Sequence, residues 1–91
     1  MIDLSAMVTA EQLVNERANN ARIVRDAAIS ATSWLVERHR DEIESATNTT
    51  LSSDQYIELQ HYRATLRDLP KSQGWPDIEL PKLPDWMRVK L

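Results

Sequence analysis

The sequence predicts an all-α protein, in which a long N-terminal helix and a shorter second helix form a helical hairpin, followed by an extended proline-rich C-terminal arm. Three observations carry this prediction. Glycine occurs once in 91 residues, whereas turn-rich β proteins use it often. Neither proline nor glycine interrupts residues 9–46. Three of the four prolines fall after Gly74, so the segment that resists helix formation lies at the end of the sequence.

The first helix is expected over about residues 9–46, where alanine, arginine, glutamate and leucine dominate. Thr9 can cap its start because Gln12, three residues on, completes a capping box. Val8 and Leu13 can pack on each other across the cap as a hydrophobic staple. With a rise of roughly 1.5 Å per residue, the helix would be about 55 Å long.

A turn is expected over residues 47–52, because threonine and asparagine compete with helix formation for backbone hydrogen bonds. Ser52 begins a second capping box, which predicts a second helix over about residues 53–69 that Pro70 ends. The apolar stripe of this helix is expected to pack on residues 34–43 of the first helix, which gives the hairpin.

Residues 70–91 form the extended arm of this prediction. Prolines alternate there with large apolar residues, and two of the three tryptophans lie in this segment. Because proline fixes the backbone and lacks an N–H donor, we expect no helix in the arm. An extended apolar chain of this kind is suited to docking on an apolar groove.

The two predicted helices differ in length, which leaves apolar surface on the first helix without an intramolecular partner. A second helix of about 25 Å covers less than half of the first, so the stripe from Leu13 to about Ala28 needs other cover. We expect a homodimer about a two-fold axis, because an alanine-rich seam lets two copies approach closely. Another protein on that face, or the arm folded back along part of it, is the alternative. The expected self-association residues are Val14, Ala18, Ala21, Val24, Ala28, Ala31 and Leu35.

Composition and charge argue against several classes of function. A chain of 10.5 kDa fits one small domain over residues 1–91. Eleven basic and fourteen acidic residues give a net charge of -3, so neither nucleic acid nor a membrane is an expected partner. With no cysteine, no phosphate-binding loop and no metal-ligand spacing, we expect no cofactor, no metal, no catalytic residue and no enzymatic activity. A cytoplasmic location is expected, because no secretory or membrane-spanning pattern is visible.

The two histidines are the natural candidates for a metal or general-base site. Neither His39 nor His61 has a second ligand at a metal-binding spacing, so we expect packing or solvated roles for both. The charged run 37–42 mixes signs at helical spacing and is expected to be a solvated face.

Two arginines on the second helix form a candidate clamp. Arg63 and Arg67 lie one helical turn apart and therefore share a face, where they could grip carboxylates of a partner or of the first helix. We favour the internal clamp, with Asp41 or Glu44 as the carboxylate.

Several short motifs of the second half occur together in a way that resembles one known family. They are Arg40-Asp41-Glu42, Thr50–Tyr56, Tyr62–Pro70 with the string YRATLRDLP, Gly74-Trp75-Pro76, and the closing Pro81 and Pro84. Together, over about residues 34–86, they resemble the phage tail assembly chaperone family of phages, prophages and phage-tail-like bacteriocins, whose members are encoded near tail fibre genes. The most specific element is the YRATLRDLP string followed by an aromatic-proline pair.

The resemblance implies a non-catalytic helper that binds the tail fibre, or a related tail protein, and assists folding or trimer assembly in the host cell cytoplasm. The second helix and the arm are then expected to shield an apolar patch of this client protein until the client's own subunits cover it. A structural adaptor that remains in the assembled tail is the alternative. The expected protein-binding residues are Tyr56, Leu59, Tyr62, Arg63, Leu66, Arg67, Trp75, Pro76, Leu80, Pro81, Pro84 and Trp86.

Overall fold

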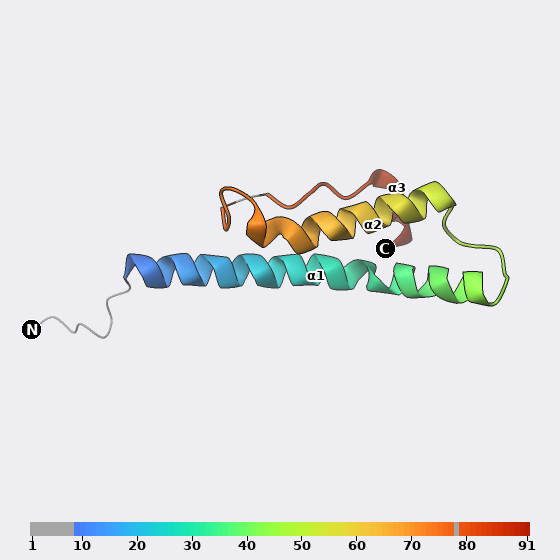
Figure 1. Cartoon of the computed structure of the whole chain (residues 1–91), viewed down its shortest axis with the longest axis horizontal. Coiled ribbons are helices and arrows are strands. Elements are labelled where there is room, and N and C mark those ends of the chain that lie inside the picture. Colours follow the sequence, from blue (N-terminus) through green and yellow to red (C-terminus); the bar gives the residue numbers. More distant parts are fainter. Residues whose placement is uncertain (1–8, 78) are drawn as a thin grey trace, which may run out of the picture.

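The computed structural model describes residues 9–77 and 79–91 and is an elongated helical hairpin (Figure 1). Its elements are helix α1 (Ala10–Glu44), helix α2 (Ser53–Asp68), the 3-10 helix η2 (Leu69–Lys71) and helix α3 (Asp85–Lys90). No strand occurs in either described range. The molecule extends over 70 × 22 × 21 Å. The all-α class and the pairing of a long helix with a shorter one are as the sequence predicts.

The starts of α1 and α2 are set by the two predicted capping boxes. The Gln12 N–H donates to Thr9 Oγ1 at 3.1 Å, and the Thr9 N–H donates to Gln12 Oε1 at 2.8 Å. Ser52 and Gln55 make the same exchange at 3.1 and 2.9 Å. Each box satisfies backbone donors that the start of a helix leaves open, which fixes where the helix begins. The predicted staple at Val8 lies outside the described residues.

Helices α1 and α2 run antiparallel in a defined register. The ring of Tyr56 stacks on the ring of His39, with centroids 4.0 Å apart and planes 13° from parallel. Seven residues further along α2, Arg63 donates to Thr32, which lies seven residues before His39 on α1. Equal steps in opposite directions indicate that the two helices stay in contact over at least two turns.

The contact region on α1 includes buried residues of the predicted region 34–43 and extends further toward the start of the helix. Within the predicted region, Leu35, Val36 and His39 are buried, whereas Trp34 and Ile43 are 41% and 60% exposed. The residues buried on α1 are Thr32, Leu35, Val36 and His39. The connection between the helices holds the first turn of α2 level with the end of α1, so later residues of α2 must meet α1 upstream of Trp34.

The core lies in the half of the molecule nearest the loop between α1 and α2. Its buried apolar members come from all three α-helices and the loop: Leu35, Val36, Leu51, Leu59 and Met87. Partly buried side chains pack against them, namely Tyr56, Tyr62, Leu83 and Trp86. Burying an aliphatic side chain of this size contributes about 1.5–3 kcal/mol, so this small cluster supplies much of the stability.

The prediction of a fully extended arm is wrong for its last part, which forms helix α3. The proline constraint ends at Pro84, and the next six residues contain neither proline nor glycine, so nothing prevents a turn and a half of helix there. Met87 is fully buried in the core, and Trp86 Nε1 donates to Glu58 Oε2 at 3.0 Å. Residues 79–84 run back along α2 (Figure 1), so the end of the arm docks on its own hairpin.

Candidate functional site

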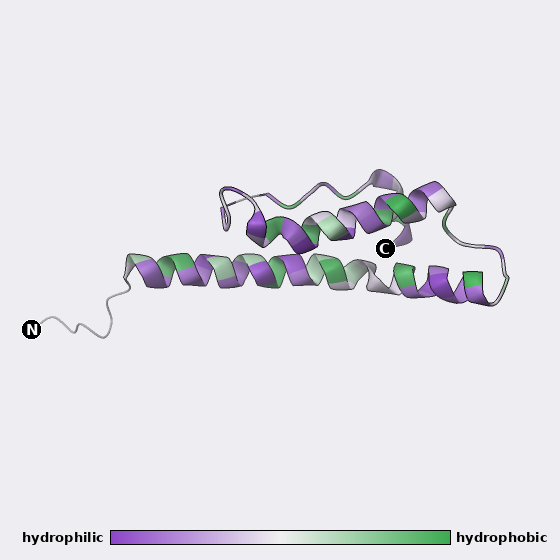
Figure 2. Ribbon diagram, viewed as in Figure 1, coloured by the Kyte–Doolittle hydropathy of each residue, from purple (hydrophilic) through white to green (hydrophobic). Residues whose placement is uncertain are grey.

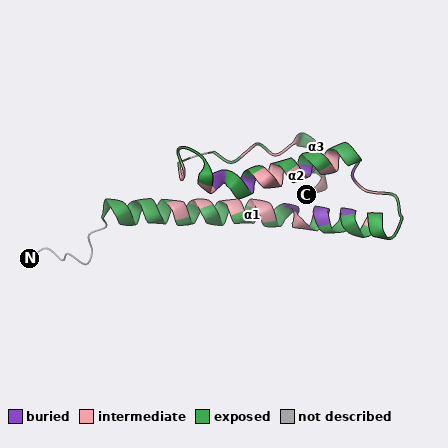
Figure 3. Ribbon diagram, viewed as in Figure 1, coloured by how far each residue is buried: buried purple, intermediate pink, exposed green. Residues whose placement is uncertain are grey.

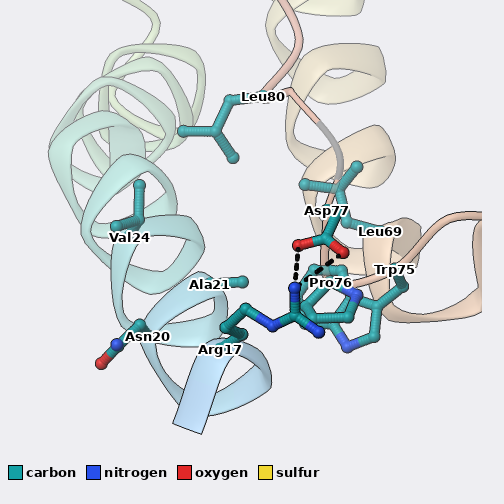
Figure 4. Close-up of a pocket in the computed structure, with 9 residues that line it drawn as sticks. All are labelled: Arg17, Asn20, Ala21, Val24, Leu69, Trp75, Pro76, Asp77 and Leu80. Carbon is teal, nitrogen blue, oxygen red and sulfur yellow. Dashed lines mark hydrogen bonds and ion pairs between the residues drawn. The ribbon is translucent and has the colours of Figure 1, made fainter. Parts of the chain in front are cut away.

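A groove lies between the first half of α1 and the segment that follows α2 (Figure 4). Its volume is ≈ 330 Å³. Most of its wall is apolar: Ala21 and Val24 from α1, then Leu69, Trp75, Pro76 and Leu80 from the other side. Its polar members are Arg17, Asn20 and Asp77. Ala21 and Val24 are among the predicted self-association residues, whereas the sequence does not predict a role for the three polar residues.

The groove follows from the register of the hairpin. Helix α2 ends at Asp68, opposite the middle of α1, and the chain then turns at η2. Gly74 has φ 88, a left-handed conformation that costs glycine little, and it redirects the chain toward α1. Trp75 and Pro76 therefore face the alanine-rich part of α1, where a small side chain such as Ala21 leaves room for an indole. The sequence shows the apolar character of both sides of this contact, but their meeting depends on the hairpin register and on the turn at Gly74.

Charged groups border the groove at one end. Arg17 Nη1 donates to both carboxylate oxygens of Asp77, at 3.4 and 3.3 Å, and both side chains are more than half exposed. The Cζ atom of Arg22 lies 5.7 Å from the centroid of the Trp75 ring, a cation–π distance. The indole Nε1 of Trp75 is buried and has no acceptor among the described residues. This end of the groove therefore holds hydrogen-bond donors that the chain itself leaves underused.

The first half of α1 also exposes large aliphatic side chains. Leu13 is 49% exposed, Val14 45%, Ile23 66% and Val24 53%. Figure 2 shows hydrophobic residues recurring along this part of α1, and Figure 3 shows the same part largely exposed. Successive helix residues are about 100° apart, so Leu13, Val14 and Val24 share one side of α1, whereas Ile23 lies opposite Val14. We call Leu13, Val14 and Val24 the amino-terminal apolar face. Helix α2 is too short to reach this face, as the difference between the two predicted helix lengths implies.

The predicted self-association residues fall into different environments. Val14, Val24 and Ala31 are exposed, whereas Ala18, Ala21 and Ala28 are half-buried. Leu35 is 1% exposed and belongs to the core of its own chain. The alternative, in which the arm folds back along part of the stripe, agrees with the position of Trp75, Pro76 and Leu80, which line the groove with Ala21 and Val24. Pairing of two copies along the rest of the stripe stays a prediction.

The predicted protein-binding residues are likewise divided between core and surface. Leu59 and Leu66 are 0% exposed. Those that are half-buried are Tyr56, Tyr62, Arg63, Trp75, Pro76, Pro81, Pro84 and Trp86. Burial raises the pKa of Tyr62 above its usual value of 10.0, because its phenol packs beside the core. Arg67 is exposed, and Leu80, at 38% exposed, lines the groove.

The internal clamp forms with Arg63, but its partners differ from those predicted. Arg63 Nη1 donates to Thr32 Oγ1 at 2.7 Å, to the Ile29 carbonyl oxygen at 2.8 Å and to Ser33 Oγ at 3.3 Å. Burial lowers the pKa of Arg63 below its usual value, because its guanidinium is partly removed from water. In the observed register, residue 63 lies opposite residues 29–33, so the predicted carboxylates of Asp41 and Glu44 lie too far along α1.

The charged run 37–42 is not the uniform solvated face that the sequence predicts. His39 is buried and has the packing role, stacked on Tyr56, while His61 is exposed. Glu42 accepts from the Thr50 backbone N–H at 3.1 Å and from Thr50 Oγ1 at 3.0 Å. The backbone hydrogen bond is the main cause that lowers the pKa of Glu42 from 4.5. Glu42 thus ties the loop to the last turn of α1.

Residues 9–77 and 79–91 contain no group of three or more histidine, aspartate or glutamate side chains placed to hold a metal ion. Within the same residues, no helix combines the length and apolar character needed to cross a bilayer.

Among known proteins, the chain matches the model of one protein family. The family model described as "Phage tail assembly chaperone protein" matches residues 18–85. Searches of curated proteins and of solved structures found no match. The matched range includes most of α1, the whole of α2, the arm up to the start of α3, and the residues that line the groove except Arg17.

Proposed function

The chain belongs to the phage tail assembly chaperone family, and from this premise we propose that it is a non-catalytic chaperone that binds a tail fibre and assists the folding or trimer assembly of that fibre. The observation that carries the proposal is the amino-terminal apolar face of α1 with the groove beside it. Soluble monomers rarely leave contiguous apolar surface unpaired unless it contacts a partner.

The proposed mechanism is transient shielding. A fibre subunit that has not yet met its neighbours exposes apolar surface, which promotes aggregation. Covering one aliphatic side chain with another removes both from water and is worth about 1.5–3 kcal/mol per fully buried side chain. A few such contacts give binding strong enough to protect the fibre subunit. They remain weak enough to be displaced when the subunits of the fibre pack on one another.

The structure changes which residues this mechanism uses. Leu59 and Leu66 pack inside the hairpin, and Trp86 is held by Glu58, so these side chains support the scaffold. Val24 and Leu80 are exposed and meet at the groove, where a client segment can contact both. The proposed contact surface is therefore centred on α1 and the start of the arm.

Self-association through the amino-terminal apolar face remains part of the proposal. Two copies related by a two-fold axis would cover Val14 and Val24 in the absence of a client, and client binding would then compete with the dimer. Multi-angle light scattering tests this directly. A dimer gives twice the 10.5 kDa of one chain, whereas a monomer at all concentrations leaves the face to the client alone.

Capture of the tail fibre encoded in the same genome tests the main proposal. Leu13→Asp places a charge on the amino-terminal apolar face, and Ile57→Asp is the matched control on α2, because Leu13 is 49% exposed and Ile57 53% exposed. In co-expression pull-downs, we expect Leu13→Asp to capture at least about ten-fold less fibre, a loss of 1.4 kcal/mol or more. Equal capture by both variants would refute the role of this face.

The second candidate function is a structural adaptor, which the elongated shape of 70 × 22 × 21 Å favours because a long helix can serve as a strut. Both functions place the protein in the host cytoplasm during particle assembly. Quantitative mass spectrometry of purified particles separates them. A chaperone is absent or present below fixed stoichiometry, whereas an adaptor is present at a constant copy number.

A further inference from the structure

The groove has an apolar part of a size that fits an aliphatic side chain. Its volume of ≈ 330 Å³ is at the lower end of the range of about 300–1,000 Å³ found for ligand pockets. Val24 is 53% exposed and Leu80 is 38% exposed, although both line the groove with Leu69. These walls are thus partly open to water, and an entering aliphatic group would bury them.

The polar end of the groove fits a carboxylate. Arg17 already binds one carboxylate, that of Asp77, through Nη1 alone. Its Nε and Nη2 atoms make no hydrogen bond within the described residues, and this edge of a guanidinium can bind a carboxylate with two parallel hydrogen bonds. The Asp77 contact, at 3.3 to 3.4 Å between side chains more than half exposed, is also weak enough to exchange.

Trp75 adds a second kind of donor at the same place. Its Nε1 is buried and has no acceptor in the described part of the chain, so an incoming oxygen that accepts from it would be favoured. Arg22, 5.7 Å from the ring centroid, adds positive charge near the indole. Figure 4 shows Trp75, Pro76, Arg17 and Asp77 gathered at one end of the groove, with Val24 and Leu80 at the other.

We propose that this groove binds a client segment in which an aliphatic side chain lies next to a carboxylate. The aliphatic side chain enters between Val24 and Leu80, and the carboxylate binds Arg17 and accepts from Trp75 Nε1. This inference rests on the proposed function, since it names the chemistry of the client segment that the chaperone holds.

Titration of the isolated chain with short peptides tests the proposal. The probe is a six-residue peptide, blocked at both ends, with a central Leu-Asp pair. Its two analogues carry Leu-Asn or Ser-Asp in place of that pair. In ¹⁵N spectra the chain has three indole N–H signals, and a Trp75→Phe spectrum identifies that of Trp75. We expect a saturable shift of this signal with the Leu-Asp peptide, and at least about ten-fold weaker binding of either analogue.

Matched variants test each half of the groove. Arg17→Ala should weaken binding of the Leu-Asp peptide about ten-fold, while Arg38→Ala, whose side chain is 58% exposed against 54% for Arg17, should leave it unchanged. Val24→Gln should weaken binding of the Leu-Asp peptide by a similar factor, because Val24 lines the groove. Ile57→Gln is the matched control and should leave binding unchanged, because Ile57 is also 53% exposed but lies outside the groove.

Three results would overturn the inference: no saturable shift at millimolar peptide, equal binding of the neutral analogue, or movement of the Trp75 signal with protein concentration alone. The last result would assign the groove to a second copy of the chain. Fibre capture is measured separately, so the two proposals fail separately. Capture without peptide binding removes the groove assignment, and peptide binding without capture removes the chaperone proposal.

Discussion

Replacing Arg63 with methionine should destabilise the hairpin far more than the same change at Arg67, one turn further along α2. Arg63 Nη1 carries two hydrogens and makes two short hydrogen bonds to α1, to Thr32 Oγ1 at 2.7 Å and to the Ile29 carbonyl oxygen at 2.8 Å. A hydrogen bond from a charged donor is worth about 1.5–3 kcal/mol. Because Arg63 is only half-buried and methionine keeps much of its packing, we expect a total loss of about 2 kcal/mol.

Thermal and urea unfolding followed by circular dichroism measure this loss. For a chain of this size, about 1 kcal/mol lowers Tm by roughly 4–8 °C, so Arg63→Met should lower Tm by about 8–16 °C with an unchanged m-value. Arg67→Met should change the free energy of unfolding by less than about 0.5 kcal/mol, as is usual for an exposed residue. A double-mutant cycle with Thr32→Val should show a coupling of at least about 0.5 kcal/mol. If Arg63→Met and Arg67→Met unfold alike, the clamp does not stabilise the hairpin.

Three further outcomes are expected from unfolding and exchange measurements. Leu59→Ala should cost about 2–4 kcal/mol because its side chain is fully buried, whereas Ile57→Ala should cost under about 1 kcal/mol because it is 53% exposed; similar losses would contradict the assigned core. The lowered pKa of Glu42 stabilises the fold above its unfolded pKa of 4.5, and this contribution disappears as the pH falls through the folded value. Glu42→Gln should therefore reduce the loss of stability between neutral pH and about pH 3, and an unaltered pH profile would exclude the contact with Thr50. Met87→Ala should speed amide exchange in α3 before the rest of the hairpin, and uniform acceleration would show that α3 does not open separately.

The ends of the helices could be predicted from the sequence because local chemistry determines them. A capping box requires only two residues three positions apart, and both boxes form with hydrogen bonds of 2.8–3.1 Å. Pro70 similarly ends α2 wherever the helix packs, and the structure places it in the 3-10 helix that follows.

The register of the two helices could not be predicted, because it depends on the path of the loop between them. Two hydrogen bonds from Thr50 to the Glu42 carboxylate hold that path. The two residues are eight positions apart, a spacing that helical periodicity does not reveal. An error in the register displaces the partner predicted for an individual side chain along the helix. Arg63 was expected beside Asp41 and instead lies beside Thr32.

The groove could be predicted only in part. The apolar stripe containing Ala21 and Val24 is visible in the sequence, and so is the apolar character of the segment around Trp75. Their meeting depends on the register and on the turn at Gly74. The ion pair between Arg17 and Asp77 joins residues 60 positions apart, which no sequence pattern indicates.

Amide hydrogen exchange of the chain, alone and with the tail fibre, would show which of its surfaces the fibre covers. If the fibre binds the amino-terminal apolar face and the groove, exchange should slow over residues 10–28 of α1 and over residues 75–80. Exchange in the middle of α2, whose inner face is already covered by α1, should stay unchanged. Slower exchange confined to α2 and α3, with residues 10–28 unaffected, would contradict the account.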